Sequence, residues 1–233
     1  MRRLLVLFFL LSPISALYAA DSVDLLWQGS TYTPPFYLGR ALWSNESAVT
    51  LAAVANIANF NPATLYYRWT KDGTVLGSRS GINKTSITFV DSVLSLPIEV
   101  KIDVRDGEDG KVLATNTITL TPTIPQILIF ENNPFYGLMM NRAIANNLSL
   151  KEAEITLAAI PLFARVNNRR AEALDYTWRT NTGDVRNTSD ATYRVPEGAS
   201  GSSAITVRIE NSGVLAQPLD KSFSITFGKQ AGL

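Results

Sequence analysis

The chain has 233 residues, a formal net charge of +1, and neither histidine nor cysteine. The two missing residue types exclude Ser-His-Asp and Cys-His catalysis and metal sites with histidine or thiolate ligands. A nearly neutral chain also offers no general attraction to nucleic acid, so we expect no nucleic-acid partner and no enzymatic activity.

The first twenty residues, MRRLLVLFFLLSPISALYAA, place two arginines before a short apolar run and end in small residues. This order is typical of a secretory signal peptide, residues 1–20. The apolar run is far shorter than the roughly 20 residues that cross a bilayer, and no later segment is long and apolar enough. We expect a secreted, extracellular or cell-envelope protein, in the periplasm or at the cell surface, with no transmembrane segment in the mature chain. Retention of the leader as an N-terminal anchor is the alternative, because Tyr18 stands where a small residue normally precedes cleavage.

The first predicted strands alternate apolar and polar residues. In LYYRWTKDG, residues 65–73, the side chains of Leu65, Tyr67 and Trp69 share one face, and Asp72-Gly73 is typical of a tight turn. VTLAAVA at 49–55 and IEVKIDV at 98–104 show the same period of two. The pattern predicts strands, with Leu65, Tyr67 and Trp69 in the core.

The next segment, VRDGEDGKV at 104–112, gathers Asp106, Glu108 and Asp109. Closely spaced carboxylates could bind calcium. Asp-Gly pairs are also common in hairpin turns for purely geometric reasons, and the spacing fails the EF-hand pattern. We therefore expect a turn and no cofactor, with calcium as the weaker alternative.

Several blocks then recur in the same order after the two prolines of TPTIPQ, residues 121–126. PPFYLGRA at 34–41 recurs loosely as NPFYGLMMNRA at 133–143, and VTLAAVA recurs as ITLAAIP at 155–161. LYYRW at 65–69 recurs as LDYTW at 174–178, and IEVKIDV recurs as AITVRIE at 204–210. A duplicated order is hard to obtain by chance. It predicts two domains, residues 21–124 and 125–233, which we call the first and the second repeat.

The second copy identifies the core face of the repeated strand. Leu174, Tyr176 and Trp178 keep the apolar pattern, whereas the residues between them change between the copies. We therefore expect these three side chains to be buried as well. The segment SLKEAE, residues 149–154, could form a helical turn ahead of the next strand.

Many short strands separated by turns, with a tryptophan on the third, predict an all-β Greek-key sandwich in each repeat. The tandem Y-x-W pattern, Tyr67-Arg68-Trp69 and Tyr176-Thr177-Trp178, resembles exported bacterial proteins with tandem immunoglobulin-like or PKD-like β-sandwich domains. The resemblance implies two such domains after the signal peptide and no particular activity.

Loops carry the candidate recognition residues. Phe60 lies between two asparagines in NIANFNPAT, residues 56–64, and Arg169 and Arg170 lie in VNNRRAEA, residues 166–173. An exposed aromatic ring or a pair of guanidinium groups could contact a glycan or a carboxylate. Burial of the ring and ordinary solvated charge are the alternatives.

These observations favour a non-enzymatic binding or adhesion protein whose partner is a protein or glycan at the cell surface. The first alternative is a structural or accessory subunit of a surface apparatus, such as a pilus or secretion machinery, that assembles through an exposed strand edge. A carbohydrate-binding module is the third hypothesis. It ranks behind the other two because such a module requires exposed coplanar aromatic rings, which the repeated strand does not supply.

Overall fold

The computed structural model describes residues 20–35, 37–90, 96–215 and 218–228. This part of the chain is almost entirely β-structure, with two short 3-10 helices, η1 (Pro62–Thr64) and η2 (Gly77–Arg79). The all-β prediction is therefore confirmed. The predicted signal peptide, except for Ala20, lies outside the described residues. No helix within them is long and apolar enough to cross a membrane.

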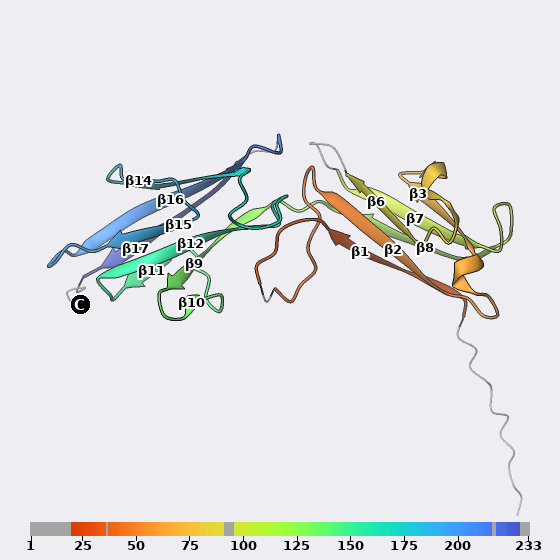
Figure 1. Cartoon of the computed structure of the whole chain (residues 1–233), viewed down its shortest axis with the longest axis horizontal. Helices are drawn as coiled ribbons and strands as arrows, with labels where there is room; N and C mark the ends of the chain where they lie inside the picture. The colour runs from red at the N-terminus through yellow and green to blue at the C-terminus, as the bar shows by residue number, and fades with distance from the viewer. Residues whose placement is uncertain (1–19, 36, 91–95, 216–217, 229–233) are drawn as a thin grey trace, which may run out of the picture.

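The first repeat folds into two antiparallel sheets (Figure 1). One sheet has the order β1 (Ser22–Gly29), β2 (Ala48–Asn56), β6 (Ser86–Val90). The other has the order β4 (Thr74–Val75), β3 (Tyr66–Lys71), β7 (Ile98–Arg105), β8 (Val112–Leu120), and β5 (Gly81–Ile82) also pairs with β3. Side chains from both sheets share one hydrophobic cluster, so the sheets face each other as a sandwich.

The second repeat has a similar arrangement, with a four-stranded sheet facing a five-stranded sheet. One sheet has the order β10 (Gly137–Leu138), β9 (Gln126–Asn133), β12 (Glu154–Leu162), β15 (Asp190–Arg194). The other has the order β11 (Asn147–Leu150), β17 (Leu219–Phe227), β16 (Gly201–Asn211), β13 (Leu174–Thr180), β14 (Val185–Arg186). These two sheets enclose a second hydrophobic cluster.

The predicted helical turn at 149–154 is wrong at its start. Residues 147–150 form β11, which pairs in parallel with β17. Leu148 and Leu150 are two apart and both pack against the core of the second repeat. A strand places such a pair on one face, whereas a helix would not.

The repeated L-x-Y-x-W strands lie at the centre of the two cores. Leu65, directly before β3, and Tyr67 and Trp69 on β3 are buried, and so are Leu174, Tyr176 and Trp178 on β13. Both indole N–H groups have acceptors: Trp69 Nε1 donates to Lys84 O at 2.8 Å and Trp178 Nε1 to Thr188 O at 2.7 Å. Burying each ring therefore leaves no indole donor without a partner.

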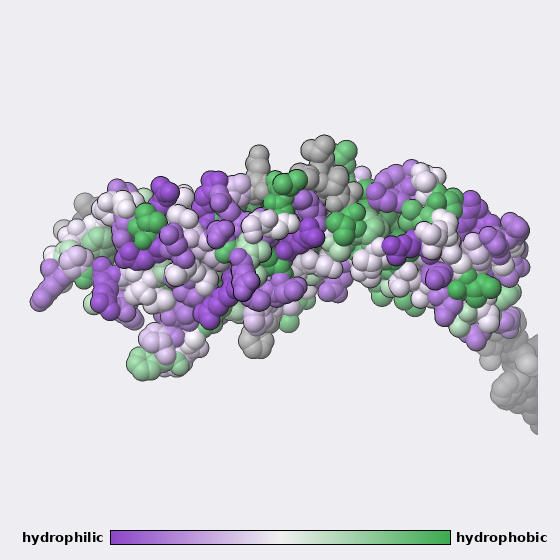
Figure 2. Space-filling view, turned by 45° about the horizontal axis from the view of Figure 1, so that its top comes forward, coloured by the Kyte–Doolittle hydropathy of each residue, from purple (hydrophilic) through white to green (hydrophobic). Residues whose placement is uncertain are grey.

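Apolar residues left outside the two cores are dispersed on the face drawn in Figure 2, which shows mainly hydrophilic side chains with small hydrophobic patches.

Turn chemistry explains the tight connection of β3 to β4, where Asp72 and Gly73 have φ of 46° and 76°. Both residues of a type I′ turn require positive φ, which Asp tolerates and Gly favours. The segment 121–125 connects β8 to β9 and so joins the two repeats.

Candidate functional site

The two repeats meet end to end, and a loop of each one contacts the other (Figure 1). The loop between β1 and β2 in the first repeat contacts residues 163 and 164, which follow β12 in the second. Tyr32 N donates to Ala164 O at 2.8 Å, and Phe163 N donates to Tyr32 O at 2.8 Å. The buried Ser44 hydroxyl donates to Phe163 O at 2.8 Å. These backbone-directed bonds fix the two repeats in register. We call this contact the junction.

Phe163 is the central residue of the junction. Its backbone has φ of 61°, a conformation that is rare for a bulky residue and that costs free energy unless surrounding contacts impose it. The Phe163 ring is buried and lies edge-to-face with Tyr37, with 5.8 Å between ring centroids and 80° between planes. The strained backbone thus places the ring and two hydrogen-bonding groups against the first repeat.

A groove of about 690 Å³ runs beside the junction. Residues 26–33, Thr50 and Ala52 form its wall on the first repeat, and Val166 and Asn167 close it on the second. Its polar lining consists mainly of hydroxyl and amide groups. Trp27 contributes an aromatic surface, with the Arg40 guanidinium 4.5 Å from the ring centroid. Such a lining offers hydrogen bonds and apolar contact but no carboxylate.

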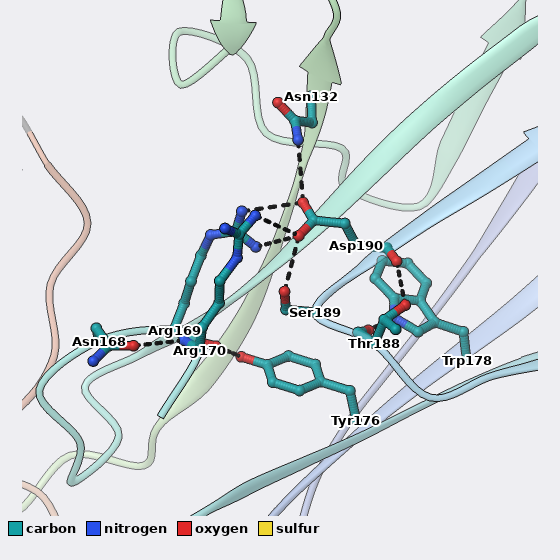
Figure 3. A network of polar contacts seen from close by, with 9 residues as sticks. All are labelled: Asn132, Asn168, Arg169, Arg170, Tyr176, Trp178, Thr188, Ser189 and Asp190. Carbon is teal, nitrogen blue, oxygen red and sulfur yellow. Dashed lines mark hydrogen bonds and ion pairs between the residues drawn. The ribbon is translucent and has the colours of Figure 1, made fainter. Parts of the chain in front are cut away.

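A polar network centred on Asp190 holds the loop that closes the groove (Figure 3). Asp190, the first residue of β15, accepts a bidentate pair from Arg169: Nη1 to Oδ2 at 2.9 Å and Nη2 to Oδ1 at 3.1 Å. Arg170 Nη2 and Ser189 Oγ donate to Oδ2 at 3.2 and 2.8 Å, and Asn132 Nδ2 donates to Oδ1 at 3.3 Å. We call these residues the Asp190 network.

The network also reaches the core tyrosine of β13. The Tyr176 hydroxyl donates to Arg169 O at 2.5 Å, and Trp178 Nε1 donates to Thr188 O two residues before Asp190. One carboxylate therefore connects the loop between β12 and β13 to β9, to β15 and, through Tyr176, to the core. The groove wall formed by Val166 and Asn167 is anchored by the same loop.

Burial and the arginine charges act in opposite directions on the ionisable groups of this site. Burial raises the pKa of Asp190, but hydrogen bonds from Arg169, Ser189 and Arg170 and the Arg169 charge outweigh it, so the pKa lies below its ordinary value. Burial raises the pKa of Tyr176 well above its usual range, and that of Tyr32 in the groove less so, while the Arg169 charge opposes both rises. At neutral pH the site therefore holds one carboxylate, two guanidinium groups and neutral phenols.

The predicted recognition residues lie in two different places. Arg169 is largely buried, and its guanidinium is taken up by Asp190, whereas the Arg170 side chain is 67% exposed and shares the same carboxylate. Phe60 follows β2 at the end of the first repeat away from the junction, and it is 42% exposed. The structure therefore brings Arg169 and Arg170 together beside the groove and leaves Phe60 apart.

The acidic candidates for calcium lie in the turn between β7 and β8. Glu108 O accepts from Arg105 Nη1 at 3.3 Å, and Glu108 Oε1 accepts a long hydrogen bond from Tyr66 at 3.5 Å. Within the described residues, no group of three or more acidic side chains is placed to hold a metal ion. The structure therefore does not bring Asp106, Glu108 and Asp109 together as ligands.

The sequence patterns do not reveal the junction residues Tyr32, Ser44 and Phe163. No cluster of charged residues and no recognised motif surrounds any of the three in the sequence. The repeated Pro-Phe-Tyr block is the one pattern that points to the junction. A loop sequence that recurs in both repeats indicates a structural role beyond turn geometry.

The sequence matches no protein-family model, and no curated protein matches it. Solved structures with a similar shape include the three N-terminal domains of the highly immunogenic outer capsid protein Hoc of bacteriophage RB49, at 16% identity and a TM-score of 0.44 over 89% of this chain. Immunoglobulin domains 1–4 of Sidekick-1 are similar at 11% identity and a TM-score of 0.25 over 88% of this chain. A mutant of the adhesin CfaE from enterotoxigenic E. coli is similar at 9% identity and a TM-score of 0.24, over 87% of this chain and 86% of the adhesin. This chain spans 59% of the Hoc chain and 65% of the Sidekick-1 chain.

Proposed function

We propose that the protein is a secreted or cell-surface binding protein, without enzymatic activity, built of two tandem immunoglobulin-like sandwiches. The strand orders support this assignment. In the first repeat β1, β2 and β6 correspond to strands A, B and E of an immunoglobulin fold, and β3, β7 and β8 correspond to C, F and G.

The observation that carries the proposal is the groove at the junction. Its walls come from both repeats, and the Asp190 network fixes the loop that supplies Val166 and Asn167. A preformed groove lowers the entropy lost when a ligand binds. Hydroxyl and amide groups around Trp27 suit a polar, uncharged partner, such as a glycan or an extended peptide segment, at the cell surface.

The experiment is a pull-down of cell-envelope components with immobilised protein, compared with two matched variants. Gln28→Trp places a bulky ring on the groove wall, where Gln28 is exposed. Glu99→Trp places the same ring on an exposed position of β7 in the opposite sheet. We expect a component that binds the wild type and Glu99→Trp but not Gln28→Trp.

Two results would contradict the proposal in different ways. Capture that is equal for both variants would exclude the groove as the binding site. Recovery of no component by the wild-type protein would argue against a binding function at all.

Calcium binding at Asp106, Glu108 and Asp109 is a separate proposal, which a rise in melting temperature at millimolar calcium would support.

A further inference from the structure

One loop is docked in the first repeat and exposed in the second, although both carry the Pro-Phe-Tyr block. In the first repeat Tyr37 contacts Phe163 across the junction. The aligned Tyr136 of the second repeat is 81% exposed, and its neighbour Phe135 is 90% exposed. Among the described residues, the exposed aromatic side chains are Tyr37, Phe60, Phe135 and Tyr136. Three of these four therefore lie away from the junction.

The second repeat receives the docked loop on the outer face of β9 and β12. Phe130, Ala158 and Ile160 lie outside the hydrophobic cluster of the sandwich, yet all three are buried. Pro34, Pro35, Tyr37 and Leu38 of the first repeat line a common cavity with Phe130 and Met140. The docked loop of the first repeat thus lies beside Phe130, on an outer sheet face that would otherwise expose this apolar side chain.

The same face of the first repeat carries two exposed apolar side chains, Leu26 and Val54, beside Asp24, which pairs with Val54 where Leu128 pairs with Ile160. Ala52 pairs with Leu26 as Ala158 pairs with Phe130, and Val54 occupies the position of Ile160 two residues further along the strand. Leu26 is 55% exposed and Val54 is 52% exposed. The first repeat therefore has the receiving face, formed by Leu26 and Val54, but no second loop of this chain docked on it in the described structure.

The exposed tip is held ready for contact. Asn133 Oδ1 accepts hydrogen bonds from the backbone N–H groups of Phe135 and Tyr136, at 3.0 and 3.3 Å. Gly137, with φ of 72°, completes the turn. In Figure 2 the loop projects from the lower left of the molecule. An ordered tip loses little conformational entropy on docking, which favours association.

We propose that copies of this protein associate head to tail, with the Phe135–Tyr136 tip of one copy docked on the Leu26–Val54 face of the next. The tip lies on the second repeat and the face on the first, and Figure 1 places β10 and β1 in opposite halves of the elongated chain. Matching surfaces already meet at the junction within one chain, which is why a second copy is the partner that fits. Leu26 also lines the groove, so a docked tip and a ligand bound there would compete, but association of the purified protein does not depend on what the groove binds.

Such an interface is heterologous, so it can extend into a chain of copies unless the geometry closes a ring. A small contact centred on two aromatic side chains is typical of a weak, reversible interface. We therefore expect association only at high protein concentration or on a surface where copies are crowded.

Sedimentation of the purified protein over a series of concentrations tests the proposal. The wild type is expected to increase in average mass with concentration. The tip variant Phe135→Ser/Tyr136→Ser and the face variant Leu26→Ser/Val54→Ser are each expected to stay monomeric. Val185→Ser, which changes an exposed apolar residue of β14, is the matched control and is expected to associate like the wild type.

Mixing the two monomeric variants gives the sharper result. The intact tip of the face variant can dock on the intact face of the tip variant, so we expect a one-to-one dimer that cannot grow further. Because the chain has no cysteine, a Tyr136→Cys copy and a Val54→Cys copy should also form a mixed disulfide that a Val185→Cys copy does not. Three results would overturn the proposal. The wild type could be monomeric at every concentration, the mixture of the two variants could stay monomeric, or the tip could bind another protein but not this chain.

Discussion

Asp190 receives hydrogen bonds from four side chains on three separate segments. Among the described contacts of this network, it is the only acceptor that links the loop after β12 to β9. The bidentate geometry to Arg169 is the strongest arrangement available to a carboxylate. Because both side chains are largely buried, loss of either partner leaves a charge without compensation.

Asp190→Asn is expected to lower the free energy of unfolding by about 3 kcal/mol at neutral pH, because the Arg169 charge stays buried without its counter-ion. The folded pKa of Asp190 lies below its unfolded value, so its stabilisation is fully present above the unfolded pKa of about 3.9. It is lost as the pH falls through the lower, folded pKa. Urea unfolding at several pH values measures both effects.

The matched control for this change is Asp175→Asn, which alters an exposed carboxyl group on β13 outside the network. We expect it to leave stability nearly unchanged. An Asp190→Asn variant that is as stable as the wild type at neutral pH would show that the network contributes little. A stability difference that grows as the pH falls below about 3.9 would contradict the lowered pKa of Asp190.

Two tyrosines of the second repeat should respond in opposite ways to loss of the hydroxyl group. Tyr176→Phe removes the hydrogen bond to Arg169 O and is expected to cost about 1 kcal/mol. Tyr193 has a buried hydroxyl that has no hydrogen-bond partner within the described part of the chain, and burial raises its pKa to about 12. Tyr193→Phe removes a desolvated polar group and should therefore not lower stability. Chemical unfolding of both variants decides the matter, and equal losses would contradict the assignment.

At the scale of the strands, β3 and β13 use the same three side chains for the same purpose. Each buries a tyrosine and a tryptophan on one face, next to a buried leucine directly before β3 and at the first position of β13, and each tryptophan bonds to a carbonyl of a neighbouring segment. The two hydrophobic clusters contain no residue in common. A change in one cluster should therefore act mainly on its own repeat.

Trp178→Ala is expected to destabilise the second repeat by about 3–5 kcal/mol, and Trp69→Ala to do the same to the first, because each leaves a large cavity. Calorimetry should show the transition of the altered repeat at a lower temperature. A shift smaller than about 5 °C would contradict the importance of the buried ring. Displacement of both transitions by the same amount would show that the repeats unfold together.

Much of this level could be predicted from the sequence because it depends on local periodicity. Alternation of apolar residues locates the long strands, and comparison of the two copies selects the buried face of β3 and β13. β11 escaped prediction because Ser-Leu-Lys-Glu has helical propensity, whereas its pairing with β17 is a contact between residues more than 70 positions apart. The very short β4, β5, β10 and β14 offer too few residues to show a period.

The candidate site was less predictable for the same physical reason. The charged pair Arg169 and Arg170 stands out in the sequence, but its partner Asp190 is brought close only by the pairing of β12 with β15. Likewise, the role of Phe163 depends on its positive φ and on a loop from the other repeat. Neither feature follows from residue types along a single segment.

At the scale of the whole molecule, the junction makes the two sandwiches one elongated body. Phe163→Gly should loosen it, because glycine keeps the positive φ without strain but removes the ring that contacts Tyr37. Spin labels at Val112→Cys and Val185→Cys, one on each repeat, would report the distance between the repeats. We expect a broader distance distribution in the Phe163→Gly variant.

Phe60→Gly is the control for this measurement, because Phe60 lies at the far end of the first repeat and should leave the distribution unchanged. A distribution that stays narrow in Phe163→Gly would mean that the connecting segment 121–125 and Ser44 suffice to hold the repeats. In that case the strained backbone of Phe163 would need another explanation.

Among the described residues of the first repeat, the Asp190 network has no counterpart, and register places Ser86 at the position of Asp190. The two sandwiches are therefore not interchangeable, because in the described part of the chain an ionic brace holds the loop between β12 and β13 of the second repeat alone. If the two repeats were joined in the opposite order, the repeat that receives the docked loop at the junction would lack this brace. The order of the two repeats thus gives the molecule a direction. The junction in its middle is a fixed contact, whereas the proposed head-to-tail contacts between copies can form and separate.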